Sequence, residues 1–325
     1  MANDRLIAIG EALIDFIPAQ SGCEFYEVDS FAPKVGGAPA NVCGAFTKLG
    51  GKSALITQLG DDPFGDKIRR ELDGCGIDTS LISFTDKANT ALAFVSLASD
   101  GNRTFSFYRK PSADMLLSPE QICSDWFKDA AVLHFCSVSL GDFPMKHAHK
   151  RAIRYARENG ALISFDPNLR FALWDSADAL KKTVWEFIPD CDVLKISDEE
   201  LEFLTDTDDI QLALPSLFTG SVKLVIYTCG ANGAYAFTRC NSAFAPSVKA
   251  NVIDTTGAGD GFIGSFLHTL ISNNITAYNL EDADSETLKK CLEFSSEFCS
   301  ISVSRKGAID SYPLPEELSS SNKGI

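Results

Sequence analysis

The sequence predicts an α/β fold in which a central, mainly parallel sheet is flanked by helices and carries a small β-sheet lid. Short apolar runs alternate along the chain with helical patterns, which is typical of a parallel sheet covered on both faces. Two stretches, about 12–31 and 90–110, break this alternation and contain strand patterns without helices, so we expect them to form the lid. With 325 residues and 45% hydrophobic content, the chain suits a single domain spanning 1–325.

Individual elements follow from the spacing of apolar residues. The strands expected in the central sheet are Arg5–Gly10, Ser53–Leu59, Val132–Ser137, Leu162–Asp166, Val193–Ile196 and Lys223–Thr228. The expected helices are Asn41–Leu49, Phe64–Leu72, Pro144–Glu158 and Ala177–Phe187. The sequence DGN at Asp100–Asn102 is favoured in the tight turn of a hairpin, and we expect such a turn in the second lid stretch.

The charge balance argues against partners that carry many negative charges. The 44 acidic residues outnumber the 29 basic ones and give a net charge of −15, so we expect no binding to nucleic acid or to an anionic membrane. One basic cluster lies on Pro144–Glu158, beside an apolar stripe that includes Ala148 and Ala152. We interpret this cluster, with His147 and His149, as a solvated face.

The cysteines and the N-terminal run predict a cytoplasmic protein. The ten cysteines include no CxxC pair and no zinc-like spacing, which favours free thiols in a reducing cytosol. The run LIAIGEALIDFI is apolar but is broken by Glu11 and Asp15 and lacks a basic leader. It is therefore predicted to be neither a signal peptide nor a membrane span.

The stretch DTTGAGD places glycines between an apolar strand, expected to end at Ile253, and a helix expected to start near Asp260. Glycines at such a junction let backbone N–H groups converge, and the helix dipole adds partial positive charge, so the turn suits an anion. A carboxylate there is explained if Asp260 takes a proton from a hydroxyl that attacks a phosphoryl group. This suggests a kinase, although a simple helix cap explains the isolated motif equally well.

A second group of residues, in the stretch Val35–Gly51, suits the binding of hydroxyl groups. Gly36 and Gly37 permit close approach of the backbone to a ligand, and Asn41 can both donate and accept hydrogen bonds. An ordinary loop with Asn41 as a helix cap explains the same pattern. Asp15, in an apolar context after a strand, is a further candidate for holding a sugar, and a buried structural acid is the alternative.

Six motifs occur in a fixed order along the chain: GGAPAN (36–41), GDDPFG (60–65), FYRKPSADMLL (107–117), DPNLR (166–170), LKISDEELEFLT (194–205) and DTTGAGDGF (254–262). With these motifs the sequence resembles the ribokinase-like (PfkB) family of carbohydrate kinases, and within it the fructokinases. The resemblance runs from about Arg5 to Tyr312, and six ordered motifs are far more specific than any one of them. It favours the kinase interpretation of Asp260 over the helix cap.

The resemblance implies two sets of residues around a sugar. The positions at which the family holds sugar hydroxyls are matched by Asp15, Gly36, Gly37 and Asn41. The side chains that line the sugar pocket in fructokinases and in the related ketodeoxygluconate kinases are matched by Phe107, Arg109 and Arg170. Because arginine can bind several hydroxyls or pair with a carboxylate, these positions fit a neutral sugar and a sugar acid alike.

The resemblance also implies the nucleotide site and the catalytic groups. The residues matched to the phosphate and ribose loop and its surroundings are Lys195, Thr228, Gly230 and Gly233. Asp260 matches the general base of the family, and its anion hole is matched by Gly257, Ala258 and Gly259. ATP is therefore the expected phosphoryl donor.

Two metal sites are implied in the same way. Glu200 matches the glutamate that positions Mg²⁺ through water, although Ser197 stands where the family motif has asparagine, a departure that the fructokinases share. Mg²⁺ is also required on charge grounds, since ATP and a carboxylate base must coexist. The loop that binds K⁺ in many relatives is matched by Asp254, Thr256, Ser302, Arg305, Gly307 and Ser311.

We therefore expect an ATP-dependent sugar kinase that makes D-fructose 6-phosphate with Asp260 as general base. The alternatives within the family are 2-keto-3-deoxygluconate, ribose or a nucleoside as substrate. From another class, the alternative is a catalytically silent regulator that binds sugar or nucleotide, but such a protein has no need for an acid in its anion hole. An exposed lid sheet has free edges to cover, and family relatives pair their lids, so a homodimer through the lid is the expected assembly.

Overall fold

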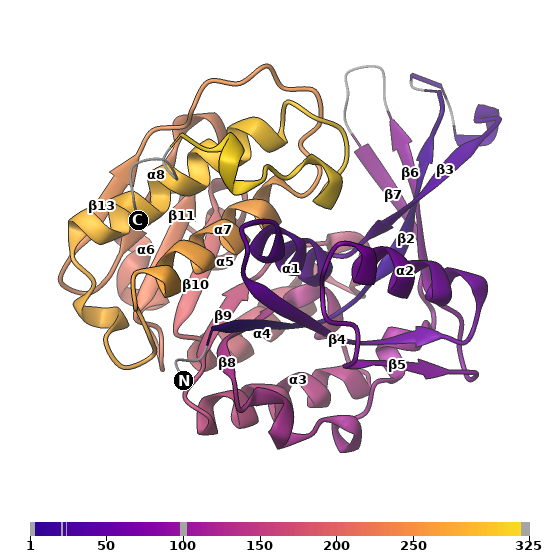
Figure 1. The fold of residues 1–325 in the computed structure, drawn as a ribbon, viewed down its shortest axis with the longest axis horizontal. Helices are drawn as coiled ribbons and strands as arrows, with labels where there is room; N and C mark the ends of the chain where they lie inside the picture. The colour runs from indigo at the N-terminus through magenta and orange to yellow at the C-terminus, as the bar shows by residue number, and fades with distance from the viewer. Residues whose placement is uncertain (1–3, 21, 24, 98–102, 320–325) are drawn as a thin grey trace.

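The computed structural model describes residues 4–20, 22–23, 25–97 and 103–319 of the chain (Figure 1). Within these ranges, nine strands form the central sheet, in the spatial order β13 (Ser242–Ala245), β12 (Ala234–Phe237), β11 (Leu224–Thr228), β10 (Val193–Ser197), β9 (Leu162–Asp166), β8 (Ala130–Cys136), β1 (Arg5–Ile9), β4 (Lys52–Gly60) and β5 (Ile82–Thr85). Neighbours from β11 to β5 pair in parallel, and β12 and β13 are antiparallel at one edge. The mainly parallel sheet and its six expected strands are confirmed.

The strands of this sheet are apolar on both faces. On β1, Leu6 and Ala8 belong to the core on one side, whereas Ile7 and Ile9 belong to the core on the other, and none of the four is exposed. Such a continuous apolar run is typical of a parallel strand that has helices on both sides.

Helices cover the two faces of the sheet as expected (Figure 1). The helices whose side chains join the first core are α1 (Ala38–Lys48), α2 (Pro63–Gly74), α7 (Ala258–Ser272) and α8 (Ser285–Ser302). Those that join the second core are α3 (Pro144–Glu158), α4 (Ala177–Phe187), α5 (Asp198–Thr205) and α6 (Ile210–Leu217). Within the described residues, none of the helices combines the length and the apolar character that crossing a bilayer requires.

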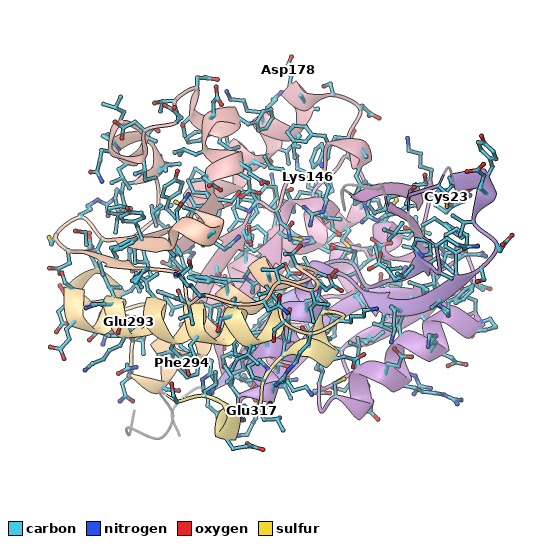
Figure 2. The ribbon with its side chains drawn as sticks, turned by 90° about the horizontal axis from the view of Figure 1, so that it is seen from above. Cys23, Lys146, Asp178, Glu293, Phe294 and Glu317 are labelled. Atoms are coloured by element: carbon cyan, nitrogen blue, oxygen red, sulfur yellow. The ribbon has the colours of Figure 1, made fainter. Side chains whose placement is uncertain are left out.

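A second sheet forms the lid, with the strand order β3 (Phe31–Gly36), β2 (Leu13–Pro18), β6 (Ala91–Leu97) and β7 (Arg103–Tyr108). Figure 2 places Cys23, in the β2–β3 connection, at one end of the molecule and Glu293 and Phe294 of α8 toward the other. The first lid stretch is longer than expected, since β3 begins at Phe31 and continues to Gly36. The predicted DGN turn lies outside the described residues.

One expectation about the glycine turn is wrong. Among the described residues, 246–257 form no strand, and the Val252 and Ile253 side chains are 62% and 54% exposed. The backbone N–H groups of Ile253 and Asp254 donate to the carbonyl of Val303, at 2.8 and 3.1 Å, rather than to a neighbouring strand. The segment therefore runs along the surface as a loop, beside the end of α8.

The interpretation of His149 as part of a solvated face is also wrong. His147 is exposed, but His149 is fully buried, with its ring nitrogens 2.8 Å from the carbonyl of Met145 and 3.3 Å from that of Ile9. Burial lowers the pKa of His149 to about 4, so the ring is neutral at neutral pH. His149 therefore belongs to the apolar stripe of α3, because its polar atoms find backbone partners there.

The packing of α7 on α1 gives a testable prediction about stability. A Cβ on Gly264 would lie 2.7 Å from the Ala45 Cβ and 2.9 Å from the Val42 carbonyl oxygen, so Gly264→Ala forces two tightly packed helices apart. We expect this substitution to lower the free energy of unfolding by about 1–3 kcal/mol, measured by urea denaturation. The matched control is Gly74→Ala at the end of α2, where a Cβ meets nothing within 4 Å and should stabilise by roughly 0.5–1 kcal/mol. Equal effects of the two substitutions would contradict this account of the interface.

Candidate active site

The candidate site lies at the carboxyl-terminal edge of the central sheet, where the loops after β1, β9, β10 and β11 meet the first turn of α7. This edge is the usual ligand-binding position in open α/β sheets. The inner pocket, of about 110 Å³ beside the lid, has among its lining residues Asp15, Gly37, Asn41, Phe107, Arg170 and Asp260. The junction pocket, of about 280 Å³, includes Asp166, Arg170, Lys195, Glu200, Gly257, Ala258, Gly259 and Asp260. The outer pocket, of about 1020 Å³, includes Lys195, Thr228, Gly230, Gly233, Ala258 and Gly259.

Asp260 is placed where the inner and junction pockets meet, since it lines both. Its carboxylate accepts hydrogen bonds from Asn41 Nδ2 at 2.9 Å and from Asn168 Nδ2 at 3.1 Å. Burial raises the pKa of Asp260 to about 6, although the hydrogen bond from Asn41 opposes the shift. A carboxyl group with such a pKa can accept a proton near neutral pH and release it again.

The turn before Asp260 presents the start of a helix to the junction pocket. Gly257 caps α7 at φ 71°, a left-handed conformation that glycine adopts without strain. Its carbonyl accepts hydrogen bonds from Tyr312 Oη at 2.8 Å and from Gly261 N at 2.7 Å, which fixes the peptide plane shared with Ala258. The partial positive charge of the helix start is thereby held beside the pocket. Of the predicted anion hole, the Ala258 N–H already donates to the Thr255 carbonyl at 3.1 Å.

A buried ion pair lies next to this turn. Lys195 Nζ donates to Asp166 Oδ2 at 2.7 Å, and a Cβ placed on Gly259 would lie 3.6 Å from the same Nζ. Burial opposes a charge on Lys195, but the carboxylates of Asp166 and Glu200 prevail and leave its pKa raised. Lys195 is therefore a cation that borders both the junction and the outer pocket.

Glu200 holds two segments of the site in place. Its carboxylate oxygens accept from the backbone N–H groups of Leu169 and Ser197, each at 2.9 Å. Ser197 caps α5 and accepts from Glu200 N at 3.3 Å, so the two residues form a reciprocal capping box. The serine that replaces the asparagine of the family motif thus has a structural partner in Glu200.

The double glycine lets the lid approach the inner pocket closely. A Cβ on Gly36 would lie 2.1 Å from Asp15 Oδ2, and a Cβ on Gly37, whose φ is 116°, would lie 2.5 Å from the Glu11 carbonyl oxygen. Position 37 therefore requires glycine, whereas a side chain at position 36 would displace the Asp15 carboxylate. Asn41, whose amide nitrogen binds Asp260, has a buried Oδ1 without a hydrogen-bond partner, which leaves an acceptor beside the pocket.

The two predicted arginines have different environments. Arg170 is exposed and lines both the inner and the junction pocket. Arg109 is 5% exposed and does not border the inner pocket, since its guanidinium is paired with Asp114 behind the pocket wall. Arg109 and Gly36 are thus the predicted sugar residues that do not line the inner pocket, whereas Phe107 does line it.

Several residues of the site were not anticipated from the sequence. Asn168, which binds Asp260, sits in the DPNLR motif at φ 45°, a conformation that asparagine tolerates better than most residues. On α8, Ser296, Cys299 and Ser300 line the outer pocket. Their spacing of three and four residues places small side chains on one helix face, and this spacing could have indicated a surface for a flat ligand.

The segments matched to a potassium loop also come together. Asp254 accepts from the backbone of Thr256 and of Gly307, each at 2.9 Å, which joins the glycine turn to the 302–311 loop. The hydroxyls of Ser302 and Ser311 are 2.8 Å apart. Arg305 instead extends its side chain to Glu317, so only its backbone is available to this loop.

Known proteins resemble the chain over almost its full length. Residues 3–315 match the pfkB family of carbohydrate kinases. Fructokinase-2 from Solanum lycopersicum is 42% identical over 324 residues, which cover 99% of this chain and 97% of that protein. Among solved structures, a fructokinase with bound ATP from Xylella fastidiosa has a TM-score of 0.90 at 34% identity, with 99% of this chain and 98% of that one covered.

A further solved structure contains ligands of interest. It is a fructokinase double mutant from Vibrio cholerae O395 in a fructose, ADP and potassium ion bound form. It has a TM-score of 0.85 at 32% identity, and 97% of each chain is covered. The match of the family over residues 3–315 and the ordered site show that the chain belongs to the pfkB family of carbohydrate kinases.

Proposed function

We propose that the chain is an ATP-dependent fructokinase, which transfers the γ-phosphate of ATP to the 6-hydroxyl of D-fructose. The observation that carries this proposal is the position of Asp260, a buried carboxyl group with a pKa of about 6 between the inner pocket and the helix start of α7. Fructokinases that are about 40% identical over nearly the full chain support fructose as the acceptor.

The inner pocket would hold the sugar. Asp15 and the unpartnered Oδ1 of Asn41 supply acceptors for hydroxyl groups, and Phe107 supplies an apolar wall from the lid. The phosphate chain of ATP would extend through the junction pocket, and the nucleoside would occupy the outer pocket near Thr228, Gly230 and Gly233. This order puts the sugar and the γ-phosphate on the two sides of Asp260.

The residues around Asp260 then perform a phosphoryl transfer. The sugar hydroxyl gives its proton to the Asp260 carboxylate as its oxygen bonds to the γ-phosphorus, and the bond from that phosphorus to ADP breaks. The N–H groups at the start of α7, together with Lys195 and Arg170, stabilise the charge on the transferring group. Closure of the lid over the sugar would exclude water and so limit hydrolysis of ATP.

The residues present fit a magnesium ion that arrives with ATP. Asp166, Glu199 and Glu200 line the junction pocket, and a few carboxylates together with phosphate oxygens and water suit the octahedral preference of Mg²⁺. Glu200, whose oxygens accept backbone N–H groups, would act through water rather than directly. When bound, the ion would neutralise phosphate charge next to the acids of the site.

The loop around Asp254, Thr256, Ser302, Gly307 and Ser311 is our proposed site for a potassium ion. Backbone carbonyls and hydroxyl groups in this loop are suitable ligands, and the Asp254–Gly307 hydrogen bond connects the loop to the glycine turn. A cation there would influence turnover through the position of that turn.

We also propose the setting in which the enzyme works. All ten cysteines are free, which suits a reducing cytoplasm. On the lid, Tyr26 and Tyr108 are 83% and 64% exposed, and pairing of two lids in a homodimer would cover such surface. A sedimentation measurement of the chain mass tests the dimer.

The test of the proposed function is ATP-dependent phosphorylation of fructose, ribose, 2-keto-3-deoxygluconate and adenosine with Mg²⁺, in K⁺ and in Na⁺ buffers. We expect fructose to have the highest kcat/KM, the product to be the 6-phosphate, and K⁺ to raise turnover. Preference for another sugar would leave only the kinase class, and a lack of turnover with every acceptor would favour the silent regulator.

Replacement of the base gives a second prediction. Asp260→Asn keeps the size of the side chain and an acceptor for Asn41 but cannot take up the proton. We expect kcat to fall by roughly 10²–10⁴-fold, whereas fructose binding measured by calorimetry is retained. A variant with nearly normal kcat would rule out the assigned base.

The raised pKa of Asp260 gives a third prediction, for the dependence of activity on pH. The base must be ionised, so kcat/KM for fructose should fall about tenfold per pH unit below the pKa of about 6. Because the hydrogen bond from Asn41 lowers that pKa, Asn41→Ala should move the acid limb to higher pH. An acid limb near pH 4, the ordinary range for aspartate, would show that the pKa of the base is not raised.

A further inference from the structure

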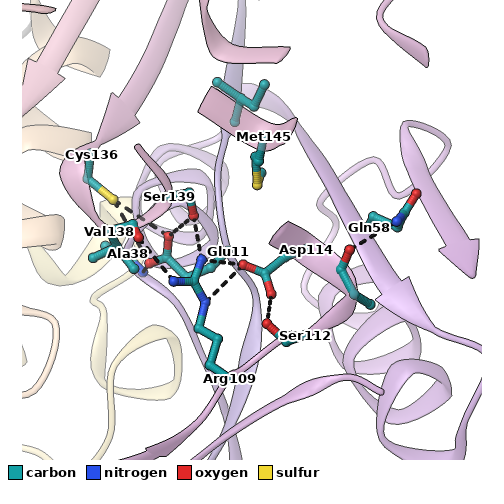
Figure 3. Close-up of polar contacts among 12 residues, drawn as sticks. Glu11, Ala38, Gln58, Arg109, Ser112, Asp114, Cys136, Val138, Ser139 and Met145 are labelled. Atoms are coloured by element: carbon teal, nitrogen blue, oxygen red, sulfur yellow. Dashed lines mark hydrogen bonds and ion pairs between the residues drawn. The ribbon is translucent and has the colours of Figure 1, made fainter. Parts of the chain in front are cut away.

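A buried cluster of charged residues lies at the base of the lid, next to the inner pocket that Glu11 helps to line. Figure 3 shows the polar contacts of this cluster. Glu11 stands between β1 and β2, where the chain first enters the lid, and Arg109 directly follows β7, where it leaves the lid. Asp114 lies in a short 3₁₀ turn, Ala113–Leu116. The Glu11, Arg109 and Asp114 residues are each at most 5% exposed, so charges among them interact with little screening by water. Burial raises the pKa of Glu11, whereas the guanidinium of Arg109 and the hydrogen bond from Ser139 oppose this shift and favour the carboxylate.

The donors of Arg109 point to groups of this cluster rather than into the pocket. Nε donates to Asp114 Oδ2 at 3.0 Å, and Nη2 donates to the same carboxylate and to Ser139 Oγ at 3.1 Å. Nη1 donates to the Val138 carbonyl at 3.1 Å. Burial opposes the charge of Arg109, but Asp114 and Glu11 prevail and keep its pKa raised. The guanidinium is therefore charged, and these bonds occupy four of its five N–H groups.

Glu11 lies on the pocket side of the cluster, since it lines the inner pocket and Arg109 does not. Its Oε1 accepts from Ala38 N at 3.2 Å, and its Oε2 accepts from Ser139 Oγ at 3.1 Å. Ser139 thus connects the two residues, as it accepts from Arg109 and donates to Glu11. At this point the wall of the pocket contains an acid, and the nearest cation is held behind it.

We propose that the Glu11–Arg109–Asp114 cluster makes the inner pocket selective for uncharged sugars over sugar acids. Asp114 and Ser139 hold the guanidinium donors of Arg109 away from the substrate, and Glu11 opposes a second carboxylate in the pocket. This inference rests on the proposed sugar kinase activity and deepens it, because it assigns specificity to residues that do not touch the reacting atoms.

The chemistry of a sugar acid explains the selectivity. A carboxylate that enters the pocket loses part of its hydration and needs a cation or several hydrogen-bond donors in return. Beside Glu11 it meets like charge instead, so the acid is rejected by repulsion as well as by missing donors. Arg170 lines both the inner and the junction pocket, and its positive charge lowers the pKa of Asp260. The charge of Arg170 therefore acts beside Asp260, where phosphate is transferred.

The experiment compares D-fructose with 2-keto-3-deoxygluconate, a six-carbon 2-keto acid, in wild type, Glu11→Gln and Asp114→Asn. The Glu11→Gln variant keeps an acceptor for Ala38 N–H but removes the charge, and Asp114→Asn weakens the hold on Arg109. Glu186→Gln is the matched control, because it removes one negative charge from a surface pair with Lys146 and Lys150. The readout is the ratio of kcat/KM for the acid to kcat/KM for fructose, with thermal unfolding as a check on folding.

We expect wild type and Glu186→Gln to share one low ratio, and Glu11→Gln and Asp114→Asn to raise it at least tenfold. A merely structural role would lower kcat/KM for both substrates and leave the ratio unchanged, and that result would overturn the proposal. Wild type that uses the acid as well as fructose would also overturn it. If Asp114→Asn does not fold, the comparison of the kcat/KM ratio between Glu11→Gln and wild type tests the proposal by itself. Absence of fructose turnover in wild type would instead refute the proposed function itself.

Discussion

The contact between the buried Asp260 carboxylate and the amide groups of Asn41 and Asn168 sets the geometry of the whole site. Asn41 comes from α1, Asn168 from the loop after β9, and Asp260 from the first turn of α7, so three segments distant in sequence must meet within hydrogen-bond reach. Gly264, whose missing side chain lets α7 pack closely on α1, is consistent with this requirement. Without the two amides, the free energy of burying a carboxylate would oppose this arrangement.

The lid depends on a comparable meeting point at its base. Three of the chain connections between the lid and the central sheet meet at Glu11. Glu11 itself lies in the connection from β1 to β2, and it accepts a hydrogen bond from Ala38 N, which follows β3. Ser139 links it to Arg109, which follows β7. The fourth connection, before β6, is held separately by Asp62, which accepts from Thr90 N at 2.8 Å. The base of the lid is therefore held by buried and half-buried polar contacts on all four of its connections.

The sequence predicted the architecture well because the relevant information is local. The strands of the central sheet are apolar on both faces, as Leu6 to Ile9 illustrate, and helices such as α3 and α4 have clear apolar spacing. Prediction from the sequence was wrong at positions whose structure depends on contacts with distant parts of the chain. The apolar pair Val252 and Ile253 suggested a strand, but the segment finds its backbone partner in Val303 instead. His149 was assigned to a solvated basic run, but the carbonyls of Met145 and Ile9 supply its partners in the core.

Within the site, too, local motifs were informative and long-range contacts were not predictable. Motifs singled out Asp260, the glycine turn and Asn41 as candidates, but no local pattern shows that Arg109 turns away from the pocket toward Asp114, five residues later. That pairing depends on the 3₁₀ turn that carries Asp114 and on Ser139, which lies 30 residues beyond Arg109 in the sequence. Contacts across such a separation are set by the packed fold, so the motif that contains Arg109 could not reveal them.

The distribution of charge explains why the cations of the site are placed where they are. A chain with a net charge of −15 must still attract the phosphates of ATP, and the acids Asp166, Glu200 and Asp260 are concentrated at that point. Lys195 and the start of α7 supply compensating positive charge there, whereas at the lid base Arg109 is neutralised by its own acids. Positive potential is thus concentrated toward the phosphate end of the site, and Arg170 is the cation that borders the sugar pocket as well. An uncharged acceptor beside a highly charged donor is the substrate pair that this distribution favours.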